Sequence, residues 1–219
     1  MSNIDEDAPE IFYIFIGRGT RIYNQVNLNN YKLNGCIISG GFAGIIENRY
    51  NTRNFILGNI QYAPFIPNKN CNSNPTSHTM AVTNSYNTEY ILEYHRNKQY
   101  PSRFSCVYAF GDYESCEKAS KIYKWDLNNV RKFKLKKTNS ELDSCIKIAK
   151  CNMEIVTRMW NCDIAIFERE SIEKMADAYW AGIGQITTET TDIDSKKRIQ
   201  RTCDVLYEYL IEGILEEVK

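Results

Sequence analysis

The feature that most limits the fold of this chain is the continuous apolar and aromatic run EIFYIFI at residues 10–16. The run has the length of a β-strand, and a strand without alternating polar residues is buried on both faces. Gly17, Arg18 and Gly19 follow the run and end it, because glycine interrupts regular structure. We therefore expect a central strand of a sheet that ends at a cleft.

The middle of the chain alternates between helix and strand signals. Tyrosines at helical spacing and a basic end predict a helix within residues 83–98, which Pro101 ends. Residues 104–110 predict a strand. Asp112 is then a suitable N-cap for a helix over residues 113–123, whose first turn contains acidic residues.

The remaining segments show the same mixture of signals. We expect an irregular region with one or two short helices at residues 22–76, a strand at 130–135, and helices at 140–149 and at 169–181, the last stopping at Gly182. Residues 187–195 (TTETTDIDS) are polar and predict a mobile connection. The terminal segment 204–218 fits either a helix or a strand, a turn and a strand, because apolar spacing and β-branched residues point in different directions.

The composition is that of a globular protein with no net charge. The 219 residues include 27 basic and 27 acidic side chains, and 43% are hydrophobic. This length favours one domain over residues 1–219. Balanced charge excludes a global attraction to polyanions, so nucleic acid would need a local basic patch. The segment RKFKLKK at residues 131–137 is a candidate, and an ordinary solvated strand face is the alternative.

Eight cysteines are scattered along the chain, and none belongs to a CxxC pair. The two histidines, His78 and His95, have no ligand-like spacing to them, so a metal site is not expected. The first residues lack a signal segment, and no apolar run approaches the roughly 20 residues that a membrane helix needs. We therefore expect reduced thiols, a cytoplasmic location and no membrane contact.

Several separated pieces of the chain resemble a known family. They are the pattern E-x-x-x-E-x-x-R on the helix near residue 90, the segment YPSRFSCVYAF, the next helix with Ala119, and the segments MADAYWAG and EYLIEG. In this order, over roughly residues 88–215, they resemble a bacterial family of unknown function whose members have the ADP-ribosyltransferase fold. The resemblance implies an α+β fold in which a split mixed β-sheet with flanking helices surrounds a cleft for NAD, and it favours a strand for the terminal segment.

The Arg-Ser-Glu form of this fold places three functional side chains on three strands. The resemblance assigns the catalytic glutamate to Glu208, which would bond a ribose hydroxyl, and the serine to Ser105, which would contact the nicotinamide side of NAD. A carboxylate suits the first role because breaking the glycosidic bond leaves oxocarbenium-like positive charge on the ribose. Glu212, Glu216 and Glu217 are nearby rivals for the catalytic role.

The resemblance assigns the arginine that holds the NAD phosphates to Arg18, beside Gly19, which lets the backbone approach a ligand closely. The family often has histidine or arginine after an aromatic pair in this strand, whereas this chain has isoleucine there, so Tyr13 and Arg21 are alternatives. Arg103 is a further expected cofactor contact, or it supports the fold by pairing with an acid from a neighbouring helix.

The same resemblance bears on the acceptor of the ADP-ribose group. Two residues before the catalytic glutamate stands Leu206, and an apolar side chain cannot orient a guanidinium, so arginine on a protein is not the expected acceptor. We expect nucleic acid, attracted by the basic residues at 131–137 and 196–198, with another protein side chain as the alternative. A compact transferase of this kind resembles a toxin of a toxin–antitoxin or phage-defence system, which implies a neutralising partner protein.

Three other functions compete with this interpretation. A binding module that kept the fold and lost the chemistry would bind NAD without releasing nicotinamide. A nucleic-acid-binding protein unrelated to NAD would depend on the basic segment alone and would show steep salt dependence. A cysteine enzyme would use Cys106 as nucleophile and His95 as base.

Overall fold

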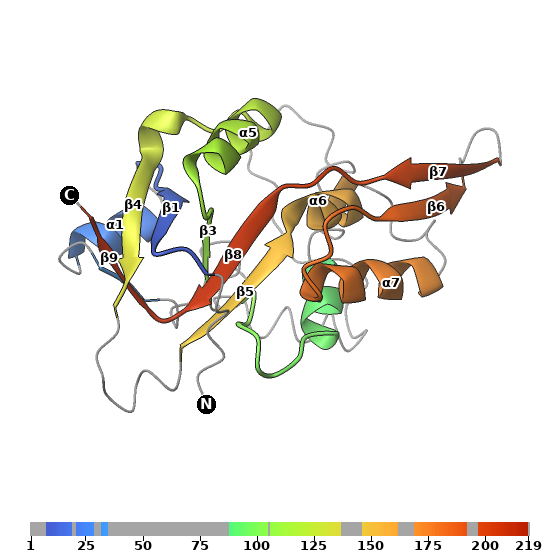
Figure 1. The fold of residues 1–219 in the computed structure, drawn as a ribbon, viewed down its shortest axis with the longest axis horizontal. Coiled ribbons are helices and arrows are strands. Elements are labelled where there is room, and N and C mark those ends of the chain that lie inside the picture. Colours follow the sequence, from blue (N-terminus) through green and yellow to red (C-terminus); the bar gives the residue numbers. More distant parts are fainter. Residues whose placement is uncertain are drawn as a thin grey trace, which may run out of the picture.

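The computed structural model describes residues 8–18, 21–28, 32–34, 88–104, 106–136, 146–161, 169–191 and 197–218. Within these ranges the fold is α+β, with strands in three sheets and helices beside them (Figure 1). All strand pairs between the described residues are antiparallel, so the parallel pairs that a mixed sheet includes do not occur among them.

The strands divide into a four-stranded sheet, a three-stranded sheet and a two-stranded ribbon. The four-stranded sheet has the order β1 (Ile11–Phe15), β4 (Val130–Leu135), β9 (Ile214–Glu217) and β2 (Lys32–Asn34). The three-stranded sheet has the order β3 (Val107–Ala109), β8 (Tyr207–Glu212) and β5 (Lys147–Asn152). The ribbon, which extends away from the other strands in Figure 1, consists of β6 (Thr187–Thr191) and β7 (Arg198–Thr202).

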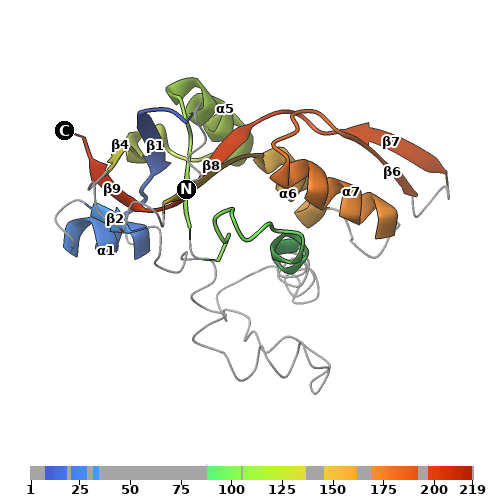
Figure 2. The same ribbon diagram turned by 60° about the horizontal axis from the view of Figure 1, so that its bottom comes forward.

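Helices lie on both sides of the three-stranded sheet. The labelled helices are α1 (Arg21–Leu28), α5 (Tyr113–Tyr123), α6 (Met153–Asn161) and α7 (Arg169–Trp180), and a 3-10 turn spans Leu127–Asn129. Figure 2 shows α5 on one side of β8, with α6, α7 and the helical residues 88–94 on the other. None of the helices in the described residues is long and apolar enough to cross a membrane.

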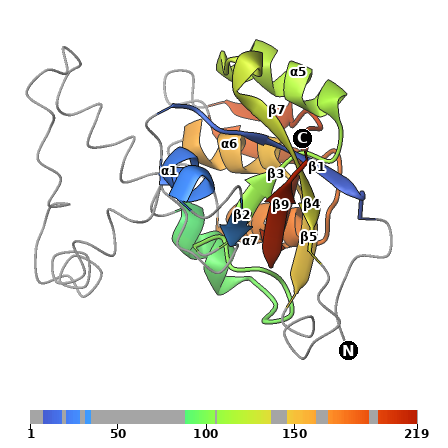
Figure 3. The ribbon, with the colours of Figure 1, turned by 90° about the vertical axis from the view of Figure 1, so that its left-hand side faces the viewer.

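The two larger sheets are joined at two places. Strands β8 and β9 follow each other directly around Gly213, so one stretch of chain passes from the three-stranded to the four-stranded sheet. On the other side, β1 passes beside β3 (Figure 3), where Tyr13 of β1 and Phe110 after β3 exchange two backbone hydrogen bonds, both 2.8 Å long. The junction of the sheets therefore lies between β1, β3 and β8.

The expected central position of the first strand is wrong, because β1 is at one end of the order of its sheet. Its apolar sequence has another cause. Phe12 and Ile14 are buried in one hydrophobic cluster, while Tyr13 and Phe15 pack on a second cluster that contains Phe110. Both faces of β1 are thus covered, and a continuous apolar run reports this burial but not the number of neighbouring strands.

Local capping signals predicted helix ends well. Helix α5 spans the expected residues, and the side chain of Asp112 accepts a hydrogen bond of 2.6 Å from the backbone N–H of Ser115. Helix α7 ends one residue earlier than expected, and Gly182 has the positive φ of 64° that this stop requires. The predicted strand at 130–135 is confirmed as β4, and the terminal segment is confirmed as strand.

Four segments differ from the sequence prediction. Residues 147–149, expected at the end of a helix, belong to β5; residues 137–145 lie outside the described residues. The polar connection at 187–195 begins with strand β6, because its β-branched threonines favour extended structure and pair with β7. Helix α6 was not predicted. The expected strand at 104–110 is shorter, since regular pairing begins at Val107.

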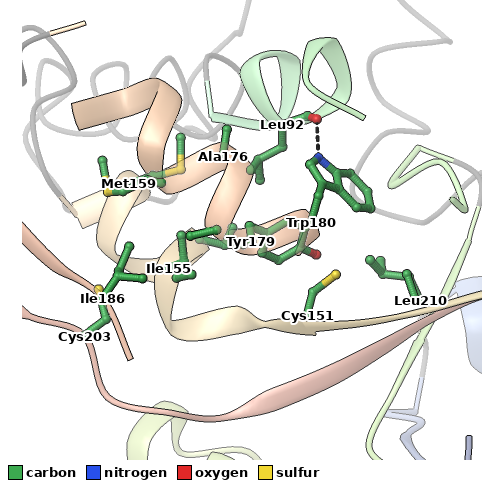
Figure 4. Close-up of a cluster of buried hydrophobic side chains, with 14 of the residues drawn as sticks. Leu92, Cys151, Ile155, Met159, Ala176, Tyr179, Trp180, Ile186, Cys203 and Leu210 are labelled. Carbon is green, nitrogen blue, oxygen red and sulfur yellow. Dashed lines mark hydrogen bonds between the residues drawn. The ribbon is translucent and has the colours of Figure 1, made fainter. Parts of the chain in front are cut away.

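The core on the α6 and α7 side binds these helices to the sheet. Ile155 and Met159 of α6 pack with Tyr179 of α7 and with Cys151 and Leu210 of the sheet (Figure 4). Another contact reaches the helical residues 88–94, where the indole Nε1 of Trp180 donates to the carbonyl oxygen of Leu92 at 2.6 Å. This core fixes α7 and residues 88–94 against the face of the sheet toward which Glu208 points.

Asn152 fixes the chain segment that leads into β8. Its amide nitrogen donates to the carbonyl oxygens of Gly184 at 2.5 Å and Asp204 at 3.0 Å. Its side-chain oxygen accepts from the backbone N–H groups of Glu154 and Leu206, both at 3.1 Å. The residue is fully buried, so the side chain replaces water for four backbone groups.

We predict that Asn152→Asp lowers the free energy of unfolding by about 3 kcal/mol or more at neutral pH, because it removes two donors and buries a charge against two carbonyl oxygens. Urea denaturation monitored by circular dichroism measures the change. The matched control is Asn24→Asp on the exposed face of α1, for which we expect about 0.5 kcal/mol or less. Equal effects of the two substitutions would contradict the role of Asn152.

Candidate functional site

A buried ion cluster connects the segment before β3 with β8 and two helices. Arg103 binds Glu89 of the helical residues 88–94 through two contacts, Nε to Oε2 at 2.5 Å and Nη2 to Oε1 at 2.8 Å. Its Nη1 donates to Oε1 of Glu208 at 2.9 Å and to the hydroxyl oxygen of Tyr179. Tyr179 in turn donates to the same oxygen of Glu208 at 2.8 Å. We call Glu89, Arg103, Glu208 and Tyr179 the ion cluster.

The charges of the ion cluster do not balance. Glu89 is 2% exposed, Arg103 3% and Glu208 6%, so water screens them little. Burial alone disfavours the charge of Arg103, but Glu89, Tyr108, Tyr179 and Glu208 together raise its pKa well above the ordinary value. The guanidinium is therefore a permanent cation. Two carboxylates against one guanidinium leave the cluster with a formal charge of about −1.

Two tyrosine rings enclose the guanidinium of Arg103. Its Cζ atom lies 5.1 Å from the ring centroid of Tyr108 and 5.1 Å from that of Tyr179. The hydroxyl of Tyr108 donates to the carbonyl oxygen of Arg103 at 2.6 Å. Burial raises the pKa of both tyrosines well above the ordinary value, so both hydroxyls stay protonated and act as donors.

A pocket of about 340 Å³ lies at the junction of the two larger sheets. Aromatic side chains from several elements line it: Tyr13, Phe15, Tyr108, Phe110 and Trp125. The polar lining residues are Asp126, Asn129 and Glu208, and no lysine or arginine lies among the described residues of this lining. The pocket, called the aromatic pocket below, thus combines π-faces with two carboxylates.

Glu208 is the point at which the ion cluster meets the aromatic pocket. Arg103 and Tyr179 both bind its Oε1 atom, and among the described residues Oε2 makes no hydrogen bond. Arg103, Glu89 and Tyr179 do not line the pocket. One carboxylate oxygen is therefore held by Arg103 and Tyr179, on a side chain that also lines the aromatic pocket.

A second hollow of about 500 Å³ adjoins the aromatic pocket through Asp126 and Asn129, which line both. Its lining includes Arg18 and Arg131, so its charge is opposite to that of the aromatic pocket. Arg131 lies 3.5 Å from a carboxylate oxygen of Glu217. We call this hollow the arginine pocket, and the two hollows together have an acidic end and a basic end.

The predicted site residues divide among these surfaces. Glu208 and Tyr13 line the aromatic pocket together, and Arg18 lies in the neighbouring arginine pocket. Arg103 is buried in the ion cluster, so its expected contact with NAD does not fit the structure, whereas the alternative of pairing with a helix acid does. Ser105 and Gly19 lie outside the described residues, as does the side chain of Arg21.

The rival glutamates are engaged elsewhere. Glu212 accepts from the backbone N–H of Ser102 at 2.8 Å and pairs with Lys147 at 3.2 Å. Glu216 pairs with Lys136, and Glu217 with Arg131, in the ion pairs between β4 and β9. None of these three acids lines the aromatic pocket, which leaves Glu208 as the glutamate of this site among the described residues.

The cysteine-enzyme interpretation does not fit the geometry. Cys106 is 2% exposed, and burial raises the pKa of its thiol well above the ordinary value, so it is a poor nucleophile. His95 is committed to another contact, with its Nδ1 atom 3.0 Å from Oδ1 of Asp177. The other described cysteines are also buried free thiols, and no group of possible metal ligands occurs in the described part of the chain.

The basic segment on β4 is less positive than its sequence indicates. Lys134 pairs with Glu10, Lys136 with Glu216 at 2.9 Å, and Arg131 with Glu217 at 3.5 Å. These acids come from the segment before β1 and from β9, so the sequence around residues 131–137 did not reveal them. Phosphate attraction by β4 is correspondingly weaker, because each of these cations already has an anion beside it.

Sequence reasoning missed Glu89, Tyr108 and Trp125. Glu89 is the first acid of the pattern E-x-x-x-E-x-x-R, and a buried glutamate on an apolar helix face was the available signal. Trp125 packs on Phe15 with a centroid distance of 5.2 Å and is still 40% exposed at the pocket. Comparison of the sequence with protein-family models and with curated proteins finds no match.

We predict that Arg103→Met lowers the free energy of unfolding by about 3–5 kcal/mol, because it leaves Glu89 and Glu208 buried without their cation. Guanidinium chloride denaturation measures the loss. The control is Lys134→Met, which removes one partner of an exposed ion pair and should cost about 1 kcal/mol or less. A small effect at Arg103 would show that the ion cluster does not hold these elements together.

Proposed function

We propose that this chain is an NAD-dependent ADP-ribosyltransferase whose aromatic pocket binds the nicotinamide end of NAD+. The observation that carries the proposal is Glu208, which lines a pocket walled by aromatic rings and whose Oε2 atom makes no hydrogen bond to the described residues. The nicotinamide ring of NAD+ is a planar pyridinium cation. Aromatic faces and carboxylates attract such a ring, whereas the described residues of the lining offer no cation for a phosphate.

The reaction needs a carboxylate at this point. The bond from ribose C1′ to the nicotinamide nitrogen breaks, and its electron pair leaves with nicotinamide. Positive charge then develops on the ribose until the acceptor nucleophile bonds C1′ and loses its proton. Glu208 would accept a hydrogen bond from a ribose hydroxyl through Oε2 and stabilise this charge more in the transition state than in the ground state.

In the proposed complex, the diphosphate and the adenosine part of NAD+ lie in the arginine pocket. Diphosphate oxygens bind guanidinium groups well, and Arg18 lines the arginine pocket, whereas Arg131 already has Glu217 beside it. We therefore place the diphosphate near Arg18, as the resemblance implied. The rival of a binding module without chemistry predicts the same binding and no release of nicotinamide.

The environment of Leu206 and the basic residues at the start of β7 bear on the acceptor. Leu206 is 2% exposed in a hydrophobic cluster, so it cannot touch a guanidinium, in keeping with an acceptor other than arginine. Nucleic acid remains our proposed acceptor, approached by the exposed Lys197 and Arg198 at the start of β7, and a protein side chain is the alternative. A toxin or phage-defence effector acting in the cytoplasm, with a neutralising partner, is the biological role that we propose.

We predict that Glu208→Gln lowers the rate of nicotinamide release at least about a hundredfold, because glutamine keeps the shape and loses the charge that stabilises the ribose cation. Labelled NAD+ is incubated with the protein and a cell extract, and protein is separated from RNA and DNA before counting. Label in nucleic acid supports the proposed acceptor, and label in protein supports the alternative.

The control for this experiment is Glu212→Gln, which changes an acid of the same strand that does not line the aromatic pocket. Its rate should stay within about threefold of the original. Full activity of the Glu208 variant would move the catalytic acid elsewhere. Binding of NAD+ by the original protein without any nicotinamide release would favour the binding module.

We also predict that Arg18→Gln weakens NAD+ binding about tenfold or more but leaves binding of free nicotinamide unchanged, because only the dinucleotide carries phosphates. Isothermal titration calorimetry with both ligands separates these effects. Lys98→Gln, at an exposed position outside both pockets, is the control. Equal weakening of both ligands by Arg18→Gln would contradict a phosphate contact.

A further inference from the structure

The ion cluster contains an acid that the proposed reaction does not use. Glu89 does not line the aromatic pocket, yet it makes both of the contacts that occupy Nε and Nη2 of Arg103. Only Nη1 is left for Glu208. A guanidinium neutralises about one carboxylate. Because Arg103 makes two contacts with Glu89 and one with Glu208, it neutralises Glu89 more than Glu208.

We infer that Glu89 keeps the aromatic pocket negative by binding Arg103, and that it thereby makes the pocket select a cationic ring. This inference rests on the proposed function, because it concerns the same pocket. Glu89 is a positioning residue in this scheme, since it acts on the ligand only through Arg103 and Glu208.

The neighbouring charges support this division. Glu93, one turn beyond Glu89, pairs with Arg96 at 2.6 Å and accepts a bond from the backbone N–H of Arg103, not from its guanidinium. Glu212 is balanced by Lys147. The excess negative charge therefore lies on the group formed by Glu89, Arg103 and Glu208. Glu208 is the member of this group that lines the pocket, so its carboxylate makes the pocket negative.

The consequence is a preference between two ligands of nearly equal shape. NAD+ carries a positive nicotinamide ring, whereas the reduced ring of NADH is neutral and the remainder of the molecule is identical. An opposite charge within about 4–6 Å changes an ionic equilibrium by about ten- to a thousandfold. We expect the protein to bind the oxidised ligand at least about tenfold more tightly than the reduced one.

Removal of the Glu89 charge should abolish this preference. In Glu89→Gln, Arg103 faces Glu208 as its one remaining buried anion, and the cluster becomes neutral. In the double variant Glu89→Gln with Arg103→Gln, the loss of both charges restores the excess charge on Glu208. We expect the single variant to bind both ligands within about threefold and the double variant to regain at least about tenfold selectivity.

The experiment measures binding of carba-NAD+ and its reduced form by calorimetry, because a methylene in place of the ribose ring oxygen prevents cleavage. Glu93→Gln is the matched control on the same helix and should keep the original preference. Thermal melting shows which variants fold. If Glu89→Gln does not fold, the selectivity of the double variant tests the inference. Loss of the preference for the oxidised ligand in the double variant would overturn it. A merely structural role of Glu89 cannot produce selectivity that falls and then returns.

The outcomes separate this inference from the proposed function. If the original protein binds neither ligand, the proposed function fails and the inference fails with it. If it binds both equally, or if Glu89→Gln keeps the preference, the NAD site stands and the role of Glu89 is overturned. Loss of selectivity in the single variant and its return in the double variant support the inference.

Discussion

The pairing of Arg103 with Glu89 and Glu208 is the interaction on which the rest of the structure depends. It joins a helix, the segment before β3 and the first residues of β8, which lie far apart in the sequence. A buried ion pair is seldom the most stable solution, because apolar residues of similar volume avoid the cost of desolvation. An ion cluster in this position therefore points to a use for its charge, and the one group that it presents to a pocket is Glu208.

The surroundings of Glu208 fix it from the backbone outward. Strand β8 pairs with β5 at Glu208, opposite Cys151, and also with β3 from Tyr209 onward, so the backbone at Glu208 has little freedom. Asn152 holds the segment before the strand, and the continuation into β9 holds the segment after it. Arg103 and Tyr179 then hold one side-chain oxygen. A carboxylate fixed in this way needs little rearrangement to meet a developing charge, which is the requirement for electrostatic catalysis.

Sequence reasoning predicted the parts of the fold that short-range chemistry determines. The Asp112 cap and the Gly182 stop gave helix ends to within a residue, because each depends on groups a few positions away. The parts that failed depend on distant partners: the end strand position of β1, and β6, which exists through its pairing with β7. At the site, motif similarity proposed Glu208 and Tyr13 as site residues, and both line the aromatic pocket. The sequence indicated that Arg103 could pair with an acid from a neighbouring helix, but it did not identify Glu89 as that acid or reveal that acids of other segments pair with the cations of β4.

Because the two pockets carry opposite charges, the proposed ligand is expected to bind in one orientation. Phosphates brought against Glu208 would meet a carboxylate in a pocket whose described lining has no cation, which is a repulsive arrangement. The same phosphates near Arg18 meet a cation. A pyridinium ring has the opposite preference and gains from the aromatic faces as well. In the proposed direction of binding, the charge pattern would orient the dinucleotide so that its scissile bond lies at Glu208, which would also accept a hydrogen bond from a ribose hydroxyl.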